Sequence, residues 1–457
     1  MGNKRIQLLI ELLLFIVFIP FGAEAAPMDT PSGTNILTLT EVINTAVANN
    51  QTIIQANLGV DLASARYQET QSAFNPLLTL SETAGRQQAD SYQTKAYDFT
   101  PNKWKKVDTN EMLQNSYDTK LSLQLPLYTG HRLEANREQA AQTIEQSKAN
   151  ALKARQNLVL DTTTAYFALL QSYNTLDLSR QSYEQMQTHL KNAALNYNNG
   201  IVAKSDVLRA EVELAAAEQN QFKAENNVQL AKTTLCNMMG VDLHTNFSVS
   251  DILPATYPVQ DLDSYLGMAR QERPDLKAMS AQMRVGKSAI TAAQSGQLPT
   301  LNLNGVYELK GNSFPANDAS WSIMLNASWN VFDGGITTSR INQAQKNLAI
   351  SQSQQQQLMD NIVLEVTQAY FNVEDASKRL LTAQKAAVKA DEDYRIAQRR
   401  YTAGISPSVE ILDSHVAFLN AKNSLIQTEF DYHTNYAKLL KATGTLDSSE
   451  RMKGNEQ

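Results

Sequence analysis

Two carboxylates with helical spacing are the residues of this sequence best placed to do chemistry. Glu410 and Asp413 follow the stretch YTAGISPSV and are three positions apart, so a helix beginning here would carry both on one face. Carboxylates that share a face crowd negative charge, which bound cations or partial protonation would relieve. The same residues would also stabilise the N-terminus of a helix through its dipole. Their spacing alone leaves both interpretations open.

The histidine and glycine patterns predict no catalytic centre. No HExxH or related ligand pattern, glycine-rich phosphate loop or nucleophile elbow is present. The one cysteine, Cys236, cannot form an internal disulfide. We therefore expect no enzyme, no bound metal and no cofactor. The histidines, which we expect to be structural or solvated, are His131, His189, His244, His415 and His433.

Composition favours an ordered protein without a nucleic-acid partner. Of the 457 residues, 42% are hydrophobic and 19% are charged, which is typical of a folded chain. The formal net charge of -6 comes from 40 Lys and Arg against 46 Asp and Glu. Because nucleic-acid binding depends on clustered positive charge, the missing basic surplus argues against it.

The first 25 residues have the pattern of a secretory signal peptide. A basic start, MGNKR, precedes the largely apolar stretch 6–22, and Ala23-Glu24-Ala25 forms a small-x-small cleavage pattern. An uncleaved membrane anchor is the alternative. No later stretch has 18 or more apolar residues, so we expect no other membrane-spanning helix. The pattern predicts a mature protein that begins near Ala26 and leaves the cytoplasm.

The rest of the chain is an internal repeat. At an offset of 204, Leu121–Gly240 aligns without a gap to Leu325–Gly444. Upstream the offset is 223, and we expect the 19 additional residues of the first copy to form a polar loop within Gly85–Ser116. We predict repeats at residues 26–255 and 256–446, followed by a polar tail at 447–457. Matching pairs include Ala165-Tyr166-Phe167 with Ala369-Tyr370-Phe371, Tyr197 with Tyr401, and Gly200 with Gly404.

Each repeat predicts a long helical hairpin. Residues 132–196 have few helix breakers, and apolar residues recur there every seven positions, as in coiled coils. Such a helix would be on the order of 100 Å long. The stretches YNNGIVAKSD and YTAGISPSVE predict helix reversals, in which Gly200 and Gly404 take the left-handed conformation. We expect Ser205 and Ser406 to cap the returning helices, with Pro407 in a first helical turn.

Short segments with period two lie between the helices and predict two antiparallel strand pairs. Aromatic residues near the strand ends favour a bilayer interface, although a small soluble sheet is the alternative. Four strands cannot close a barrel, so strands that span a membrane would require several chains to share one barrel. The predicted strands are Leu77–Gly85, Asp118–Leu127, Thr300–Leu309 and Ser320–Val331, and the aromatic residues are Tyr117, Tyr128, Trp321, Trp329 and Phe332.

The joint pattern resembles the TolC family of outer-membrane channel proteins. It includes LPLYTG with WNVFDGG, TAYF with QAYF, and the two glycine turns, and it covers about residues 37–446. The resemblance implies a mainly α fold with β, built as a homotrimer with a twelve-stranded β-barrel in outer-membrane lipid and a helical tunnel through the periplasm of a Gram-negative bacterium. It also implies an exit duct for an efflux pump or a type I secretion system. The partners would be a periplasmic adaptor (membrane fusion) protein and an inner-membrane RND or ABC transporter.

The resemblance also assigns expected roles at the two turns. The tips would dock the adaptor, and the second tip would close the aperture. The family's basic lock residue corresponds to Ser406, so Lys204 or Arg209 would have to replace it. The expected docking residues are Gly200, Ile201, Val202, Gly404, Ile405 and Ser406, and the expected aperture residues are Glu410, Asp413, Tyr401 and Asp206.

The alternative function is a periplasmic adaptor or a coiled-coil scaffold. Such a protein would also have a signal peptide and long hairpins. Adaptors normally carry one hairpin and β-rich soluble domains, whereas this chain predicts two hairpins and amphipathic strand pairs. The sequence identifies neither the cargo nor the class of pump.

Overall fold

The computed structural model describes residues 36–89, 93–98, 103–108, 112–250, 257 and 259–446. The predicted signal peptide and the predicted polar tail lie outside the described residues. The helices are α2 (Leu39–Asn49), α3 (Gln51–Ser72), α4 (Arg132–Asn198), α5 (Lys204–Met239), α6 (Leu262–Glu272), α7 (Pro274–Gln294), α8 (Ile336–Thr402) and α9 (Ser408–Ala442), with a 3₁₀ turn at Ser295–Gln297. The strands are β1 (Ile36–Leu37), β2 (Leu77–Ala89), β3 (Gln93–Asp98), β4 (Lys103–Asp108), β5 (Met112–Tyr128), β6 (Ser248–Val249), β7 (Thr300–Gly311) and β8 (Asp318–Ser328).

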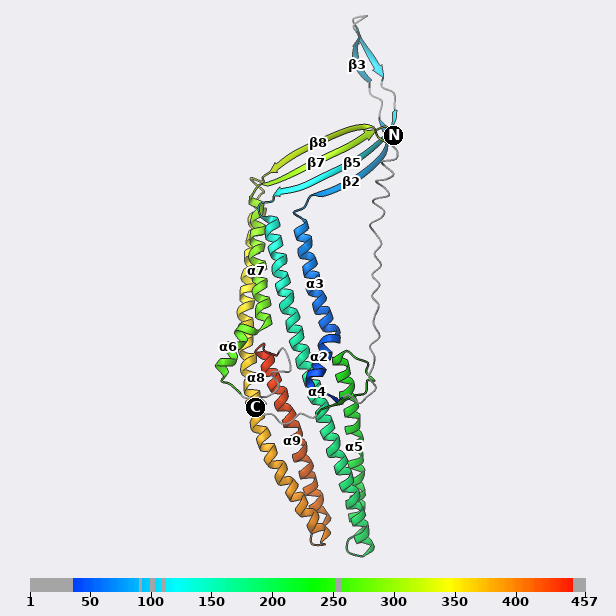
Figure 1. The fold of residues 1–457 in the computed structure, drawn as a ribbon, viewed down its shortest axis with the longest axis vertical. Coiled ribbons are helices and arrows are strands. Elements are labelled where there is room, and N and C mark those ends of the chain that lie inside the picture. The colour runs from blue at the N-terminus through cyan, green and yellow to red at the C-terminus, as the bar shows by residue number, and fades with distance from the viewer. Residues whose placement is uncertain are drawn as a thin grey trace.

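Two long helical hairpins form most of the molecule. Helices α4 and α8 have 67 residues each, and each packs along its shorter return helix, α5 or α9. Both hairpins extend in the same direction, away from the sheet (Figure 1). The long helices begin and end 204 positions apart, at 132 and 198 in the first repeat and at 336 and 402 in the second. Among the helices of the described residues, none has an apolar stretch long enough to cross a bilayer.

Short helices pack beside the sheet-proximal halves of the long ones. Helix α3 lies along α4, and α7 lies against both α4 and α8 (Figure 1). The bends between the paired short helices fall at Asn50 and Arg273, and each bend residue binds the end of a return helix. The amide of Asn50 donates to Met238 O at 2.9 Å, and the guanidinium of Arg273 donates to Ala442 O at 2.9 Å. The second bend is charged, since Arg273 also forms ion pairs with Asp275 at 2.7 Å and Glu365 at 2.6 Å.

The four long strands form one antiparallel sheet in the order β2-β5-β7-β8. The predicted pairs within each repeat are confirmed, and the pairing of β5 with β7 joins the two repeats. Apolar residues stand in register across all four strands on one face. One such row is Leu80, Leu121, Tyr307 and Trp321, and the next is Leu78, Leu123, Gly305 and Ile323.

The predicted loop within Gly85–Ser116 is wrong. Strands β2 and β5 continue to pair across this stretch, from Gly85 opposite Ser116 to Ala89 opposite Met112. Beyond them β3 pairs with β4 and projects past the sheet (Figure 1). A polar composition excludes burial but not strand pairing, which the backbone supplies. Strand β8 ends at Ser328, before the predicted end at Val331, and the indole of the next residue, Trp329, donates to Gln297 O at 2.9 Å.

The main core lies near the middle of the long helices. Tyr166 and Phe167 of α4 are buried, and the Tyr166 hydroxyl donates to Ser250 O at 2.9 Å. Their equivalents in α8 are less enclosed, since Phe371 is exposed. The duplicated motif therefore serves the core in the first repeat, whereas part of it faces outward in the second.

Candidate functional site

The two helix reversals form the end of the molecule farthest from the sheet (Figure 1). Gly200 has φ 72° and Gly404 has φ 69°, so both take the left-handed conformation that the sequence predicts. A Cβ atom at either glycine would meet open space, so backbone conformation rather than crowding favours glycine. Ile201 N and Ile405 N donate back to Asn196 O and Arg400 O at 2.8 and 2.9 Å, which completes the helix ends.

The predicted serine caps are wrong. Helix α5 starts after Ala203 and α9 after Pro407, neither with a side-chain cap. Ser205 lies inside α5. Pro407 occupies the N-cap position of α9, so Ser406 lies one residue too early to cap it, and its hydroxyl donates to Glu410 Oε2 at 2.5 Å instead.

The residues expected to dock a partner differ in accessibility. Ile201 is 64% exposed and Ile405 is 71% exposed, and both neighbouring glycines are exposed. Val202 is half-buried, and Ser406 is only 9% exposed. Of the expected docking residues, the two isoleucines are thus accessible, whereas Ser406 serves the turn.

The two carboxylates lie in a groove between α8 and α9. Its volume is about 520 Å³, and Glu410 and Asp413 line it together with Asp393 and Arg400 of α8. Arg400 forms an ion pair with Glu410. The spacing argument correctly predicts that both carboxylates share one face. It does not predict that the guanidinium of Arg400 pairs with one of them. Lys204 and Arg209, the expected substitutes for the lock residue, form no ion pair with any residue the structure describes.

Tyr401 lies where the two hairpins meet, and the charge of Asp206 acts on it. Tyr401 is 4% exposed, and its ring centroid is 4.9 Å from that of His189 on α4. Burial raises the pKa of the Tyr401 phenol, and the negative charge of Asp206 adds to the effect. Within one chain the charge of Asp206 thus acts on both Tyr401 and His189, and the prediction did not include this histidine.

Two buried histidines are the residues that sequence reasoning missed. His189 of α4 and His415 of α9 are both buried. The signal was their position on apolar helical stripes: Met186 precedes His189 by three residues, and Phe418 follows His415 by three. Burial lowers the pKa of His189, although Asp206 opposes the shift. Burial also lowers the pKa of His415, to about 4, with a further contribution from His189.

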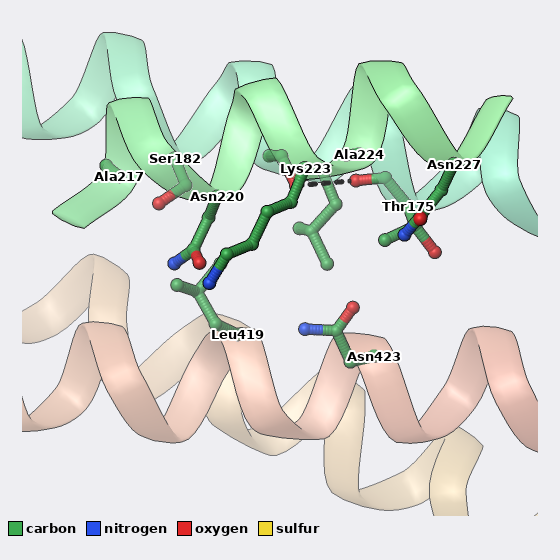
Figure 2. Close-up of a pocket in the computed structure, with 11 residues that line it drawn as sticks. Thr175, Ser182, Ala217, Asn220, Lys223, Ala224, Asn227, Leu419 and Asn423 are labelled. Atoms are coloured by element: carbon green, nitrogen blue, oxygen red, sulfur yellow. Dashed lines mark hydrogen bonds between the residues drawn. The ribbon is translucent and has the colours of Figure 1, made fainter. Parts of the chain in front are cut away.

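A second groove lies farther from the tips, between the first hairpin and α9 (Figure 2). Its volume is about 290 Å³, and its lining mixes apolar side chains with amides and hydroxyls. Figure 2 shows Lys223 of α5 extended toward Leu419, with Asn423 facing Thr175. Within the described ranges no three His, Cys, Asp or Glu side chains converge to hold a metal ion. This groove can donate and accept hydrogen bonds, but it offers no nucleophile beside a general base.

Long helical hairpins beneath an amphipathic sheet define the class of protein, because solved bacterial outer-membrane channels have the same fold. The CmeC outer membrane channel of Campylobacter jejuni superposes with a TM-score of 0.78, covering 95% of each chain at 16% sequence identity. The chain belongs to the outer membrane efflux protein family, whose model matches residues 42–241 and 265–445. The resemblance to the TolC family and the mainly α fold with β are confirmed.

Two relatives show how far this chain has diverged in sequence within the family. Outer membrane protein TolC of Escherichia coli is 24% identical over 311 residues, which are 65% of this chain and 63% of TolC. The chain thus matches less than two thirds of TolC. Alkaline protease secretion protein AprF of Pseudomonas aeruginosa is 23% identical over 396 residues, which are 83% of this chain and 78% of AprF.

Proposed function

We propose that this chain is one subunit of a channel-tunnel in the outer membrane of a Gram-negative bacterium. The channel serves as a passive exit duct for a tripartite efflux pump or a type I secretion system. The observation that carries this proposal is the continuous apolar face of the four-stranded sheet. Leu325 on this face is 60% exposed, and Leu78, Leu80 and Ile323 are also exposed. A face of this kind is unfavourable in water and suited to lipid.

The edges of the sheet support a shared barrel. Among the described strands, β2 pairs only with β5 and β8 pairs only with β7, so both outer edges lack a partner. Unpaired backbone groups are costly in lipid, and a barrel removes every edge. Three copies would supply twelve strands, with β8 of one chain antiparallel to β2 of the next. Three chains therefore supply the twelve strands that the family resemblance implies, which makes the proposed assembly a homotrimer.

Exposed apolar side chains on the helices support the same assembly. Phe222 and Leu230 of α5 are exposed, as are Phe371 and Val388 of α8. Such residues on long helices are typical of surfaces that neighbouring subunits cover. In the trimer these helices would form the wall of the tunnel in the periplasm.

The exposed tips support docking of a periplasmic adaptor, which would link the channel to an inner-membrane RND or ABC transporter. Ile201 and Ile405 are the most accessible apolar side chains there. The name of AprF concerns protease secretion, and the matched family is named for efflux. Both kinds of cargo, small molecules and polypeptides, suit the same duct. We also propose the division into repeats at 26–255 and 256–446.

A charge on the apolar face tests the proposal. Leu325→Arg should destabilise the inserted barrel by about 2 to 4 kcal/mol if the residue faces lipid near the midplane, and so reduce trimer yield. The matched control is Asn326→Arg, because Asn326 is the next residue on the opposite face. The measurement is the amount of heat-resistant trimer in the outer-membrane fraction. Equal yields from both variants, or parent protein in the soluble periplasmic fraction, would contradict the proposal.

A further inference from the structure

The contact between the two hairpins contains a reciprocal pair of histidines. His189 belongs to α4 of the first hairpin and contacts Tyr401 and Ser408 of the second. His415 belongs to α9 of the second hairpin and contacts Gln185 of the first. Each ring therefore bridges the hairpins, close to the tips that form the inner mouth in the proposed function.

Both rings are held in a way that suits the neutral form. His189 Nε2 lies 3.2 Å from the Ser408 hydroxyl, and His189 Nδ1 is buried with no hydrogen-bond partner among the described residues. His415 Nε2 donates to Gln185 Oε1 at 3.1 Å, and its ring lies 5.1 Å from that of Tyr394. A second proton on either ring would place a positive charge in a buried, aromatic environment. Such burial is costly without a paired anion.

The charges around the pair do little to compensate such a proton. On α5, Asp206 is the carboxylate that acts on His189, and its attraction is weaker than the effect of burial. From α8 the pair faces the phenols Tyr394 and Tyr401, and His415 faces the positive charge that His189 would gain. Other charged groups of α8 and α9 also lie near the tips. Arg399 is in the last turn of α8, and the groove described above is lined by Asp393, Arg400, Glu410 and Asp413.

We propose that His189 and His415 are positioning residues that hold the second hairpin against the first while they are neutral, and that acid opens this contact by protonating them. The inference rests on the proposed function, in which the tips form the mouth of the tunnel. Because α4 packs along α5 and α8 along α9, each hairpin keeps its own helix pairing when the tips part, while apolar residues shared between the hairpins, such as Met186 and Phe418, become exposed. Acid would therefore widen the mouth and leave each hairpin intact.

The direction with pH follows from linkage. The pKa of such a histidine is lower in the closed contact than its ordinary value of 6.5 in water. The histidine therefore stabilises the closed contact at pH values above 6.5, and this stabilisation is lost as the pH falls toward the lowered pKa. For His415 the lowered value is about 4. Between pH 7 and pH 5, His415 alone would then shift the equilibrium about 20-fold toward the open contact. Protonation of His189 would act in the same direction.

The test is a distance between the hairpins, measured by double electron–electron resonance in the purified full-length protein. Spin labels would be attached at Gln187→Cys on α4 and Val416→Cys on α9, both exposed positions beside the pair, in a Cys236→Ala background. Labelled chain would be assembled with excess unlabelled chain, so that only distances within one chain contribute. We expect a longer distance at pH 5 than at pH 7.

The decisive variant is His189→Gln with His415→Gln, which keeps hydrogen-bonding groups but cannot gain a charge. We expect its distance to be the same at both pH values. The matched control is His433→Gln, because burial also lowers the pKa of His433 to about 4, yet this residue contacts Tyr257 and Phe167 in the main core. The control should keep the response of the parent. If the double variant does not assemble, the single variant His415→Gln should reduce the response.

Two outcomes would overturn the proposal: an unchanged parent distance between pH 7 and pH 5, or a full response in a His189 or His415 variant that folds. The distance reports the contact without any transport. A pH-dependent distance in a protein that forms no pore in lipid bilayers would therefore contradict the proposed function and leave the histidine contact standing.

Discussion

At the residue scale, Arg400 changes the charge of the tip groove. Its guanidinium pairs with Glu410, and the Ser406 hydroxyl donates to the same carboxylate. Asp413 lies in the same groove, and no ion pair joins it to another described residue. The two carboxylates are therefore not equivalent. In the proposed trimer, three guanidinium groups would offset three of the six negative charges of Glu410 and Asp413.

Ion selectivity of the purified channel in a planar bilayer measures this balance. Glu410→Gln with Asp413→Asn should reduce the preference for cations over anions and weaken block by trivalent cations. Arg400→Gln should have the opposite effect, because it exposes the charge of Glu410. Both effects should shrink at high salt, since charges more than about 8 to 10 Å apart are screened near physiological ionic strength.

Unchanged selectivity in both of these variants would mean that the groove does not face the conducting path. The carboxylates would then serve only the N-terminal turn of α9 through the helix dipole. Trimer yield should match that of the parent in each case, because the altered side chains lie at the surface of the tip.

Single residues were predictable where backbone conformation decided the outcome. Gly200 and Gly404 were identified because a helix reversal requires a positive φ, which few other residues tolerate. Ser406 was misassigned as a cap because α9 begins one residue later than expected, with Pro407 at the N-cap position. His189 and His415 were missed because their partners come from the other hairpin, more than 200 positions away in sequence. Sequence periodicity places a residue on a face but does not identify what packs against that face.

At the element scale, the bend between α6 and α7 is the strongest polar anchor of a return helix. Arg273 is buried and binds Ala442 O at the end of α9, as well as Asp275 and Glu365. Lys441 adds an ion pair to Glu365 at 3.0 Å. Asn50, the corresponding residue of the first repeat, makes one neutral hydrogen bond to α5. The return helix α9 is therefore fixed by charge at its C-terminal end, beside Glu365 in the middle of α8.

Removing Arg273 should destabilise the protein more than removing Asn50. Arg273→Ala leaves the carboxylate of Asp275, which is 12% exposed, without its partner; losing one partner of an enclosed ion pair typically costs about 3 to 5 kcal/mol. Asn50→Ala removes two neutral hydrogen bonds, one to Met238 O and one from Thr52 N at the start of α3, worth about 1 kcal/mol each. The measurement is the thermal unfolding temperature of the purified protein at pH 7, and equal losses in the two variants would contradict the prediction.

Acid should narrow the gap between the parent and Arg273→Ala. Burial opposes a lowered pKa at Asp275, but the hydrogen bonds and charge of Arg273 prevail and lower it below the ordinary 3.8. This stabilisation is present above the ordinary value and is lost as pH falls through the lowered one. Unfolding temperatures measured between pH 7 and pH 3 should therefore converge at the acidic end.

The elements themselves were largely predictable. The predicted helix 132–196 is observed as Arg132–Asn198, because unbroken heptads and a glycine stop define such a helix locally. The extension of β2 and β5 was not predictable, since its polar residues gave no alternation to detect. The hairpin β3–β4 was missed for the same reason.

At the scale of the whole molecule, the duplication predicts how neighbouring copies pair. Within the chain, β5 pairs with β7 so that Leu121 stands opposite Tyr307. Leu325 is the repeat equivalent of Leu121 at the offset of 204, and Ala84 is the equivalent of Tyr307 at the offset of 223. The duplication therefore predicts that Leu325 of one chain stands opposite Ala84 of the next. Ala84 and Leu325 both lie on the apolar face of their strands. The predicted pairing of β8 with β2 of the next chain therefore continues the apolar face from one chain to the next.

Cysteines at these two positions test the register. Residues directly opposite each other in antiparallel strands have Cβ atoms about 4.5 to 5.5 Å apart, close enough for a short crosslink. Ala84→Cys with Leu325→Cys should form covalent trimers on oxidation. Ala84→Cys with Asn326→Cys is the matched control, because Asn326 points to the other face. Efficient crosslinking in the control alone would mean that the register is shifted by one residue.

The joint between β5 and β7 also bears on the cost of assembly. If each repeat were a separate chain, the same twelve-stranded barrel would need six bodies to meet, whereas the fused chain needs three. Each association costs on the order of 4 to 15 kcal/mol in lost translational and rotational freedom at a 1 M standard state. Covalent fusion removes three such associations, so assembly depends on the third power of chain concentration rather than the sixth. A dilute chain arriving at a membrane surface gains most from that difference.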